Sequence, residues 1–245
     1  MLFLGLNSFA GKSEIQQSIL SNDTLKSFVL KQLGIKRTEI KEELLTEKTL
    51  PNTTNQSVLV IPKLIGEDEG MFTIDAMILV VNNQTGKILQ RFSQENILES
   101  DAVAISEFII DTAPYILSKE VRAFGIRVNY RNTSSVNPFY KTDISLYVQE
   151  GNQLKRVFGD YEISVENGER GSDECNSQQR QMNGIIALDS DSAHGYFNLI
   201  IKEKISMRIF QVDATGDCKE TITEEHERKT VLYYNGTTYN WGLDW

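Results

Sequence analysis

The chain has 245 residues, of which 25 are Lys or Arg and 34 are Asp or Glu, so its formal net charge is −9. This length gives one large β domain or two small ones and is ample for a hydrophobic core. Its 40% apolar and 24% charged residues are typical of a globular protein, not of a disordered chain, collagen or a coiled coil. The acidic balance argues against nucleic-acid binding, which needs excess Lys and Arg to displace counterions. Two His and two Cys are too few for a closed Cys/His zinc site, an iron–sulfur centre or a haem attachment.

The first ten residues have the features of the end of a secretory signal. Residues 2–6 are apolar, and Ser8-Phe9-Ala10 matches the small-x-small pattern that signal peptidase reads, which predicts cleavage after Ala10. Because no Lys or Arg precedes the short apolar run, we expect residues 1–10 to be a signal remnant whose true start lies upstream. A buried N-terminal strand is the alternative. Later runs fall short of the ~18 apolar residues of a membrane span, so we expect a soluble periplasmic or secreted protein.

The two cysteines point to the same compartment. Cys175 and Cys218 are 43 positions apart, and both lie in polar, turn-rich surroundings. A free cysteine is usually buried among apolar residues. The sequence therefore predicts a Cys175–Cys218 disulfide in an exported protein, with two free thiols in a cytosolic protein as the alternative.

A short helical part comes first in the chain. Apolar residues at spacings of three and four predict a helix over about 24–33, with Asn22-Asp23-Thr24 as N-cap chemistry and Gly34 as its end. A second short helix is expected around 38–45. Residues 11–50 thus form a helical extension, and the composition of 51–56 indicates a linker.

After residue 57 the apolar period changes to two, which predicts strands. The near-continuous apolar run 77–81 suggests burial on both faces of its strand. Asn235-Gly236 is a strong hairpin signal. Predicted strands are 57–64, 71–81, 87–92, 102–111, 121–130, 143–149, 153–158, 161–166, 185–189, 195–212, 230–234 and 237–241.

Hairpin turns without helical crossovers make the sheets of the 57–245 domain antiparallel. The expected fold is mainly β, an antiparallel sandwich or a propeller-like arrangement of sheets, with a short N-terminal helical extension. No strict repeat of 20–50 residues, which would mark a propeller, is present.

The motifs of common catalytic and metal sites are missing or incomplete. Asp189 and Asp191, and Asp213 and Asp217, place acids in loops, but neither loop has the ligand spacing of a calcium loop. The second is better explained as a turn with Gly216 at positive φ. Ser192 and His194 are close in sequence but lack a nucleophile elbow, and His226 lies in a charged, solvated segment; we expect His194 to cap a turn. No phosphate-binding glycine motif occurs. We therefore assign no catalytic, cofactor or metal residues.

The strongest irregularity is in the distribution of charge. Residues 121–142 contain three Arg and one Lys but no acid, whereas 160–193 contain eight acids and only two bases. A long polar loop with aromatic residues lies within the basic stretch. Arg and Tyr in an adaptable Ser/Asn loop are typical of a recognition surface. The candidate partner surface is Arg127, Arg131, Asn137, Phe139 and Tyr140. Pairing of the arginines with the protein's own acids, and burial of the aromatics, is the alternative.

Several segments resemble a known group of proteins. Asp-Thr-Ala-Pro-Tyr (111–115), Arg-Ala-Phe-Gly-Ile-Arg-Val (122–128), Asn-Pro (137–138), Leu-Tyr-Val (146–148) and His-Gly-Tyr-Phe-Asn-Leu-Ile (194–200) carry the resemblance. They are similar to a loosely defined family of exported Gram-negative bacterial proteins with no assigned activity. The similarity covers about 57–240 and implies an envelope location and an all-β core. It implies no catalytic residues.

These observations favour a non-enzymatic binding module. The expected partner is a protein of the cell envelope, as for an inhibitor or an immunity protein, an analogy at the level of fold alone. We expect no cofactor and no nucleic acid. The alternative function is a glycan hydrolase that works through two carboxylates, at least one with a raised pKa.

Overall fold

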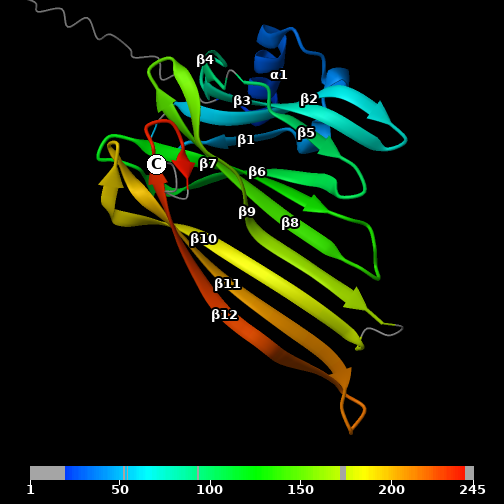
Figure 1. Cartoon of the computed structure of the whole chain (residues 1–245). Helices are drawn as coiled ribbons and strands as arrows, with labels where there is room; N and C mark the ends of the chain where they lie inside the picture. The colour runs from blue at the N-terminus through cyan, green and yellow to red at the C-terminus, as the bar shows by residue number, and fades with distance from the viewer. Residues whose placement is uncertain (1–19, 52, 54, 93, 172–174, 241–245) are drawn as a thin grey trace, which may run out of the picture.

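The structure is a computed structural model that describes residues 20–51, 53, 55–92, 94–171 and 175–240 (Figure 1). The predicted signal remnant, and the end of the last predicted strand at Trp241, lie outside these residues. The elements in chain order are α1 (Asn22–Leu33), the 3₁₀ helices η1 (Arg37–Glu39) and η2 (Glu42–Leu44), β1 (Thr46–Thr49), β2 (Gln56–Asp68), β3 (Met71–Asn82), β4 (Ile88–Arg91), β5 (Ile97–Ser100), β6 (Ala104–Ile116), β7 (Arg122–Arg131), β8 (Phe139–Glu150), β9 (Gln153–Arg170), β10 (Ser177–Ala193), β11 (Tyr196–Val212), β12 (Cys218–Tyr234) and β13 (Tyr239–Asn240).

The strands form two antiparallel sheets. A five-stranded sheet has the order β1-β2-β3-β4, with β5 also paired to β3, and an eight-stranded sheet runs from β13 to β6 in reverse chain order. Neighbouring strands of the large sheet are consecutive in the chain, as expected when hairpin turns connect them. The prediction of a mainly β, antiparallel fold with an N-terminal helix is confirmed, and the packing of two sheets is that of a sandwich.

Three hydrophobic cores hold the layers together. The first lies between the two sheets and includes Ile78 and Val80 of β3. The second lies within the large sheet, where β11 to β13 pack on β8 and β9. The third lies between α1 and the opposite face of the small sheet, where Leu79 and Val81 are buried. Alternate residues of β3 thus enter two cores, so the expected burial of residues 77–81 on both faces is confirmed.

The helical part forms as predicted only in its first half. The Ser21 side chain caps α1 by accepting a hydrogen bond from the Thr24 N–H, and Gly34 ends the helix at φ 67°. The predicted second helix over 38–45 is wrong. That segment holds η1, a bridge from Ile40 to Lys63 of β2, and η2. Ile40, Leu44 and Leu45 are buried by this irregular path, which explains the helix-like spacing of the apolar residues.

Several predicted strand boundaries in the large sheet are wrong: one expected turn is missing, two strands start early, and the other ends differ by up to five residues. Gly159-Asp160 was expected to be a turn, but β9 continues through it with a bulge. Asp160 adopts φ 51°, and its N–H donates to Ser145 Oγ at 3.0 Å. The other two strands start earlier than predicted, β10 at Ser177 and β12 at Cys218. The added segments have few apolar side chains, so the period-two signal is weak there.

These added segments belong to a part of the large sheet that extends beyond the sandwich, toward the lower right of Figure 1. We call it the sheet extension: residues 164–170 of β9, 177–183 of β10, 204–212 of β11 and 218–227 of β12, aligned by direct pairing. None of the three cores includes a residue of 165–181, 206–212 or 218–229. At the base of the extension Met182 and Ile205 are still buried, at 6% and 9% exposure, whereas residues 218–227 of β12 are exposed along their whole length.

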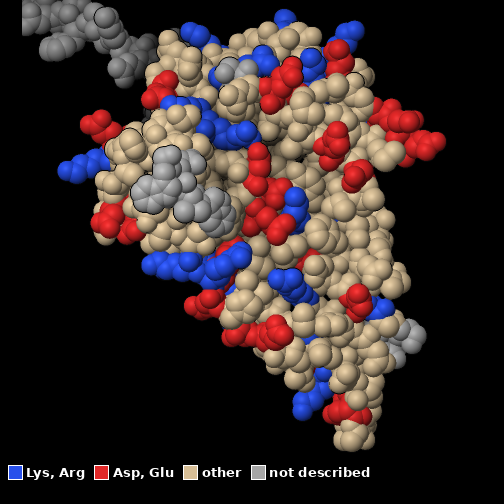
Figure 2. Space-filling view, in the orientation of Figure 1, with Lys and Arg blue, Asp and Glu red and all other residues tan. Residues whose placement is uncertain are grey.

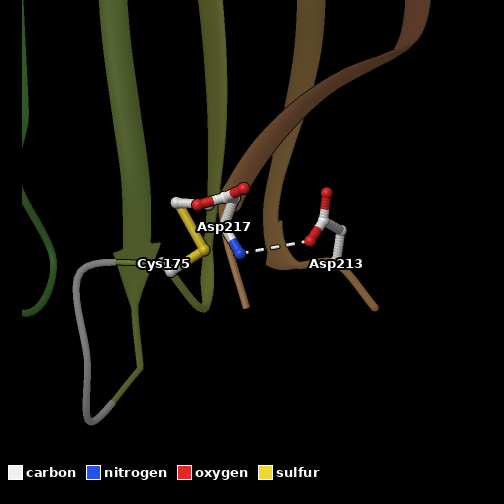
Figure 3. The surroundings of a disulfide bond; sticks show 4 residues. Cys175, Asp213 and Asp217 are labelled. Carbon is white, nitrogen blue, oxygen red and sulfur yellow. Dashed lines mark hydrogen bonds between the residues drawn. A yellow bond between two sulfur atoms is a disulfide. The ribbon is translucent and has the colours of Figure 1, made fainter. Parts of the chain in front are cut away.

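The tip of the extension carries the disulfide. Cys175 and Cys218 are bonded, with their Cα atoms 5.4 Å apart, which confirms the predicted pair. Figure 3 shows the turn beside it, where the Asp217 N–H donates to Asp213 Oδ1 at 3.1 Å. Gly216 has φ 92°, so the predicted turn is also confirmed. Among the described residues, no helix has the length and apolar character needed to cross a membrane.

Candidate binding site on the sheet extension

The extension exposes two faces with different chemistry. Residues paired across antiparallel strands lie on the same face. One row of pairs is Phe139, Asn167, Arg180 and Met207, and we call this side the amide face. The next row is Arg131, Tyr140, Glu166 and Gln181, and its side chains point to the other side, the tyrosine face.

The structure separates the five residues of the predicted partner surface. Arg131 and Tyr140 are paired on the tyrosine face, where both are exposed, Tyr140 to 49%. Phe139 lies on the amide face and is half-buried, with Asn137 beside it. Arg127 is further along β7, outside the extension. Two of the five residues thus form a common exposed surface.

Arg127 is bound within the protein. Its Nε and one terminal nitrogen both lie 2.8 Å from Asp111 Oδ2. The Tyr115 hydroxyl donates to the same oxygen at 2.8 Å, and the Ala113 N–H donates to Oδ1 at 2.9 Å. Burial alone would raise the pKa of Asp111, but these hydrogen bonds outweigh it and lower the pKa. Burial and Asp111 raise the pKa of Tyr115 to about 12. This arginine therefore stabilises a bulge in β6.

The β7–β8 loop is held in place by its own amide groups. The Asn132 side chain accepts from the Phe139 N–H at 3.0 Å and donates to the Asn137 carbonyl at 2.8 Å. The loop then runs beside β9, where the Gly168 N–H donates to the Pro138 carbonyl at 3.1 Å. The loop thus continues β8 and positions Asn137 and Phe139 against the extension.

Gly168 lies at a close approach between β9 and β10. A Cβ atom at this position would lie 2.9 Å from the Gln178 carbonyl oxygen, so only glycine fits without a shift of the backbone. A hollow of about 590 Å³ opens on the amide face, and one of about 310 Å³ opens on the other side. Gly168, Pro138 and Gln178 line both hollows. The two faces are separated there by a single layer of backbone.

The hollow on the amide face, the amide hollow, combines an apolar side with planar polar groups. Five chain segments line it: Val103 of the β5–β6 connection, the β7–β8 loop with the start of β8, and parts of β9, β10 and β11. Its residues are Val103, Asn132, Asn137, Pro138, Phe139, Asn167, Gly168, Glu169, Gln178, Arg180 and Met207. Within the described chain, the side chains of Asn137, Asn167, Glu169 and Arg180 make no hydrogen bond or ion pair.

The tyrosine face carries arginines and aromatic residues. Arg170 and Phe210 border its hollow and lie in one paired row through Ser177. Neither Arg131 nor Arg170 forms an ion pair with a described residue. Figure 2 shows acids and bases interspersed over the extension, with no large area of one sign. This face therefore combines the unpaired Arg131 and Arg170 with the exposed Tyr140 and the half-buried Phe210, while Glu166 accepts a hydrogen bond from the Gln179 side chain.

The buried carboxylates lie elsewhere and are engaged. Glu203, whose side chain is 1% exposed, is ion-paired with Arg228 and accepts from the Tyr161 hydroxyl at 2.9 Å. The hydrogen bond from Arg228 lowers the pKa of Glu203. Burial raises the pKa of Asp143, whose carboxylate is 2.8 Å from Lys141 Nζ. Neither acid lines either hollow, so these carboxylates do not form a substrate cleft with them.

The other predicted candidates occupy turns, a bulge and an edge strand. His194 and Gly195, at φ 47° and 88°, form the turn between β10 and β11 itself, and the His194 side chain makes no capping hydrogen bond to a described residue. Asp189 and Asp191 lie in a bulge of β10. His226 is exposed as predicted, but in β12 and not in a loop. Among the described residues, no group of three or more His, Cys, Asp or Glu could hold a metal ion.

Sequence reasoning missed Asn167, Gln178 and Arg180 of the amide hollow. They lie in the segment that was singled out only for its excess of acids. The alternation of Ile205 and Met207 in β11 indicates an apolar face of this strand. It does not show that the second hydrophobic core ends before Met207.

The fold and these two faces define the class: a mainly β protein of two antiparallel sheets with a disulfide-closed extension. Comparisons with protein-family models, curated proteins and solved structures found no match to this chain.

Proposed function

We propose that this protein is a non-enzymatic binding module that recognises a protein partner through the tyrosine face. The observation that carries the proposal is the pairing of Arg131 with Tyr140 on an uncovered face of the extension. Tyr and Arg dominate the binding energy of protein interfaces, because each combines a large contact area with directional hydrogen bonds. Phe210 and Arg170 extend the same surface around a hollow that can accept a partner side chain.

The charges of this face indicate which kind of surface the proposed partner presents. Arg131 and Arg170 lack acidic partners in the described chain, so an acidic patch on the partner would complement them. The free edge of β12 is a less suitable docking element, because its charged side chains and its bulge at Thr223 protect it against strand addition. Recognition by a face, as in an inhibitor or immunity protein, fits these features better.

The disulfide supports an oxidising compartment, and we propose a periplasmic or secreted location on this basis. The test is the intact mass of the protein purified from its native host, with and without reduction and thiol alkylation. A mass that matches removal of residues 1–10, with thiols that react only after reduction, is expected. An unprocessed protein with two reactive thiols would contradict export.

The partner surface is tested by photo-crosslinking. A crosslinking amino acid replaces Tyr140, and a matched control replaces Ile65, which is 56% exposed on β2 of the small sheet. The partner protein that crosslinks to position 140 but not to position 65 is then purified, and its affinity for this chain is measured. Arg131→Ala/Tyr140→Ala should weaken binding by roughly 30-fold or more, as expected for hot-spot residues.

The control for folding is the melting temperature. Arg131 and Tyr140 are exposed, so the double variant should melt within about 2 °C of the wild type. Asn167→Ala, at a residue that borders the amide hollow and not the other one, should bind the partner normally. A double variant that binds normally, or that unfolds, would show that this face is not the partner surface.

A further inference from the structure

We infer that the amide hollow is a binding site for a neutral oligosaccharide. This site is separate from the proposed protein surface, because it opens on the opposite face of the extension. The inference rests on four properties of the hollow: its volume, its polar side chains, its apolar side, and a floor whose backbone groups are already hydrogen-bonded in the sheet.

The polar groups of the hollow are planar and mixed in hydrogen-bonding capacity. In the register of the sheet, Asn167 lies opposite Arg180 and Glu169 lies opposite Gln178, so four polar side chains form a square on β9 and β10. Gln178 Nε2 donates to Met207 Sδ at 3.0 Å, which leaves its amide oxygen as an acceptor, and the other three side chains make no hydrogen bond within the described chain. Amides both donate and accept, the guanidinium donates and the carboxylate accepts. Adjacent hydroxyl groups of a sugar ring match such planar groups, because each hydroxyl can also donate and accept.

The net charge of the lining indicates a neutral ligand. One carboxylate, Glu169, and one guanidinium, Arg180, are the ionised side chains in the lining. Since they offset each other, the hollow gives no electrostatic preference to an anion or a cation. Phe139 and Met207 provide an apolar side on which the C–H face of a pyranose ring can pack.

The floor of the hollow disfavours an extended peptide as the ligand. Residues 166–170 of β9 and 177–181 of β10 pair with each other across the floor. Their backbone groups are used in the sheet, so a peptide could not be added as a strand. Recognition must come from side chains. A hollow of about 590 Å³ is within the usual range for small ligands and is large enough for a short oligosaccharide.

The experiment is a titration of the ¹⁵N-labelled full chain, followed by two-dimensional NMR. The probes are maltotetraose, cellotetraose and chitotetraose, with tetragalacturonate as the charged comparison. The side-chain amide signals of Asn137, Asn167 and Gln178 report directly on the hollow. At least one neutral tetrasaccharide should shift these signals and the backbone signal of Phe139, while the signal of Gln181 on the opposite face stays in place.

Variants then test the contact. Asn167→Ala/Gln178→Ala removes two exposed amides and should weaken binding of the same tetrasaccharide by roughly tenfold or more. Gln181→Ala, which removes an amide from the tyrosine face of β10, should bind like the wild type. The inference is overturned if no neutral probe shifts the three amide signals, if only tetragalacturonate does so, or if the double variant binds normally.

Discussion

Removal of the disulfide should lower the stability of the whole protein. The Cys175–Cys218 bond closes a loop with a sequence separation of 43 residues. In the chain-entropy treatment, a cross-link that closes a loop of this size lowers the entropy of the unfolded chain. This stabilises the folded protein by about 4 kcal/mol. The variant Cys175→Ser/Cys218→Ser should therefore lose about 4 kcal/mol of unfolding free energy and melt about 8–16 °C below the wild type.

Urea unfolding followed by circular dichroism measures this difference. The matched control is the wild type with the disulfide reduced and the thiols blocked, which should lose a similar amount. Hydrogen exchange should show the largest loss of protection in residues 204–212 and 218–227, next to the missing bond. A loss below about 1 kcal/mol in both samples would refute the reasoning, since the cross-link would then not restrict the unfolded chain.

Three further substitutions test contacts in the large sheet. Asp111→Asn should cost about 2 kcal/mol at pH 7, because the ion pair with Arg127 is lost. The lowered pKa of Asp111 contributes stability above about pH 4, which is lost as the pH falls through the folded pKa; acid titrations should thus show a shallower fall for the variant. Glu203→Gln removes a charge whose side chain is 1% exposed and should cost about 1–2 kcal/mol in urea unfolding; no change would mean that its arginine partner contributes nothing. Gly168→Ala places a Cβ 2.9 Å from the Gln178 carbonyl oxygen and should cost about 1–3 kcal/mol, with altered NMR signals on both faces of the extension; unaltered signals would contradict this tight fit.

The fold class could be predicted because, in the strands of the sandwich, successive side chains point to opposite faces and the faces toward a core carry apolar residues. β3 and the inner part of β8 bury alternate residues in defined cores, so their apolar patterns are strong. β12 could not be predicted over residues 218–229. It is an edge strand, and with no core beside it selection for alternate apolar residues is absent. A strand that buries neither face resembles a loop in its composition.

The site was only partly predictable for a similar reason. Arg131 and Tyr140 stood out by residue type, and the register then places them side by side. Arg127 stood out equally, but its partner Asp111 is 16 positions away and meets it only through strand pairing. The amide hollow combines residues of five segments. Composition identifies such side chains, but only the register of the sheet decides which face each one occupies.

The shared wall at Gly168 links the two faces of the extension. Pro138, Gly168 and Gln178 border both hollows, so the same short stretch of chain forms part of the wall of each. A substitution at one of these residues, such as Gly168→Ala, therefore changes the surroundings of both hollows and cannot serve as a probe of one face alone.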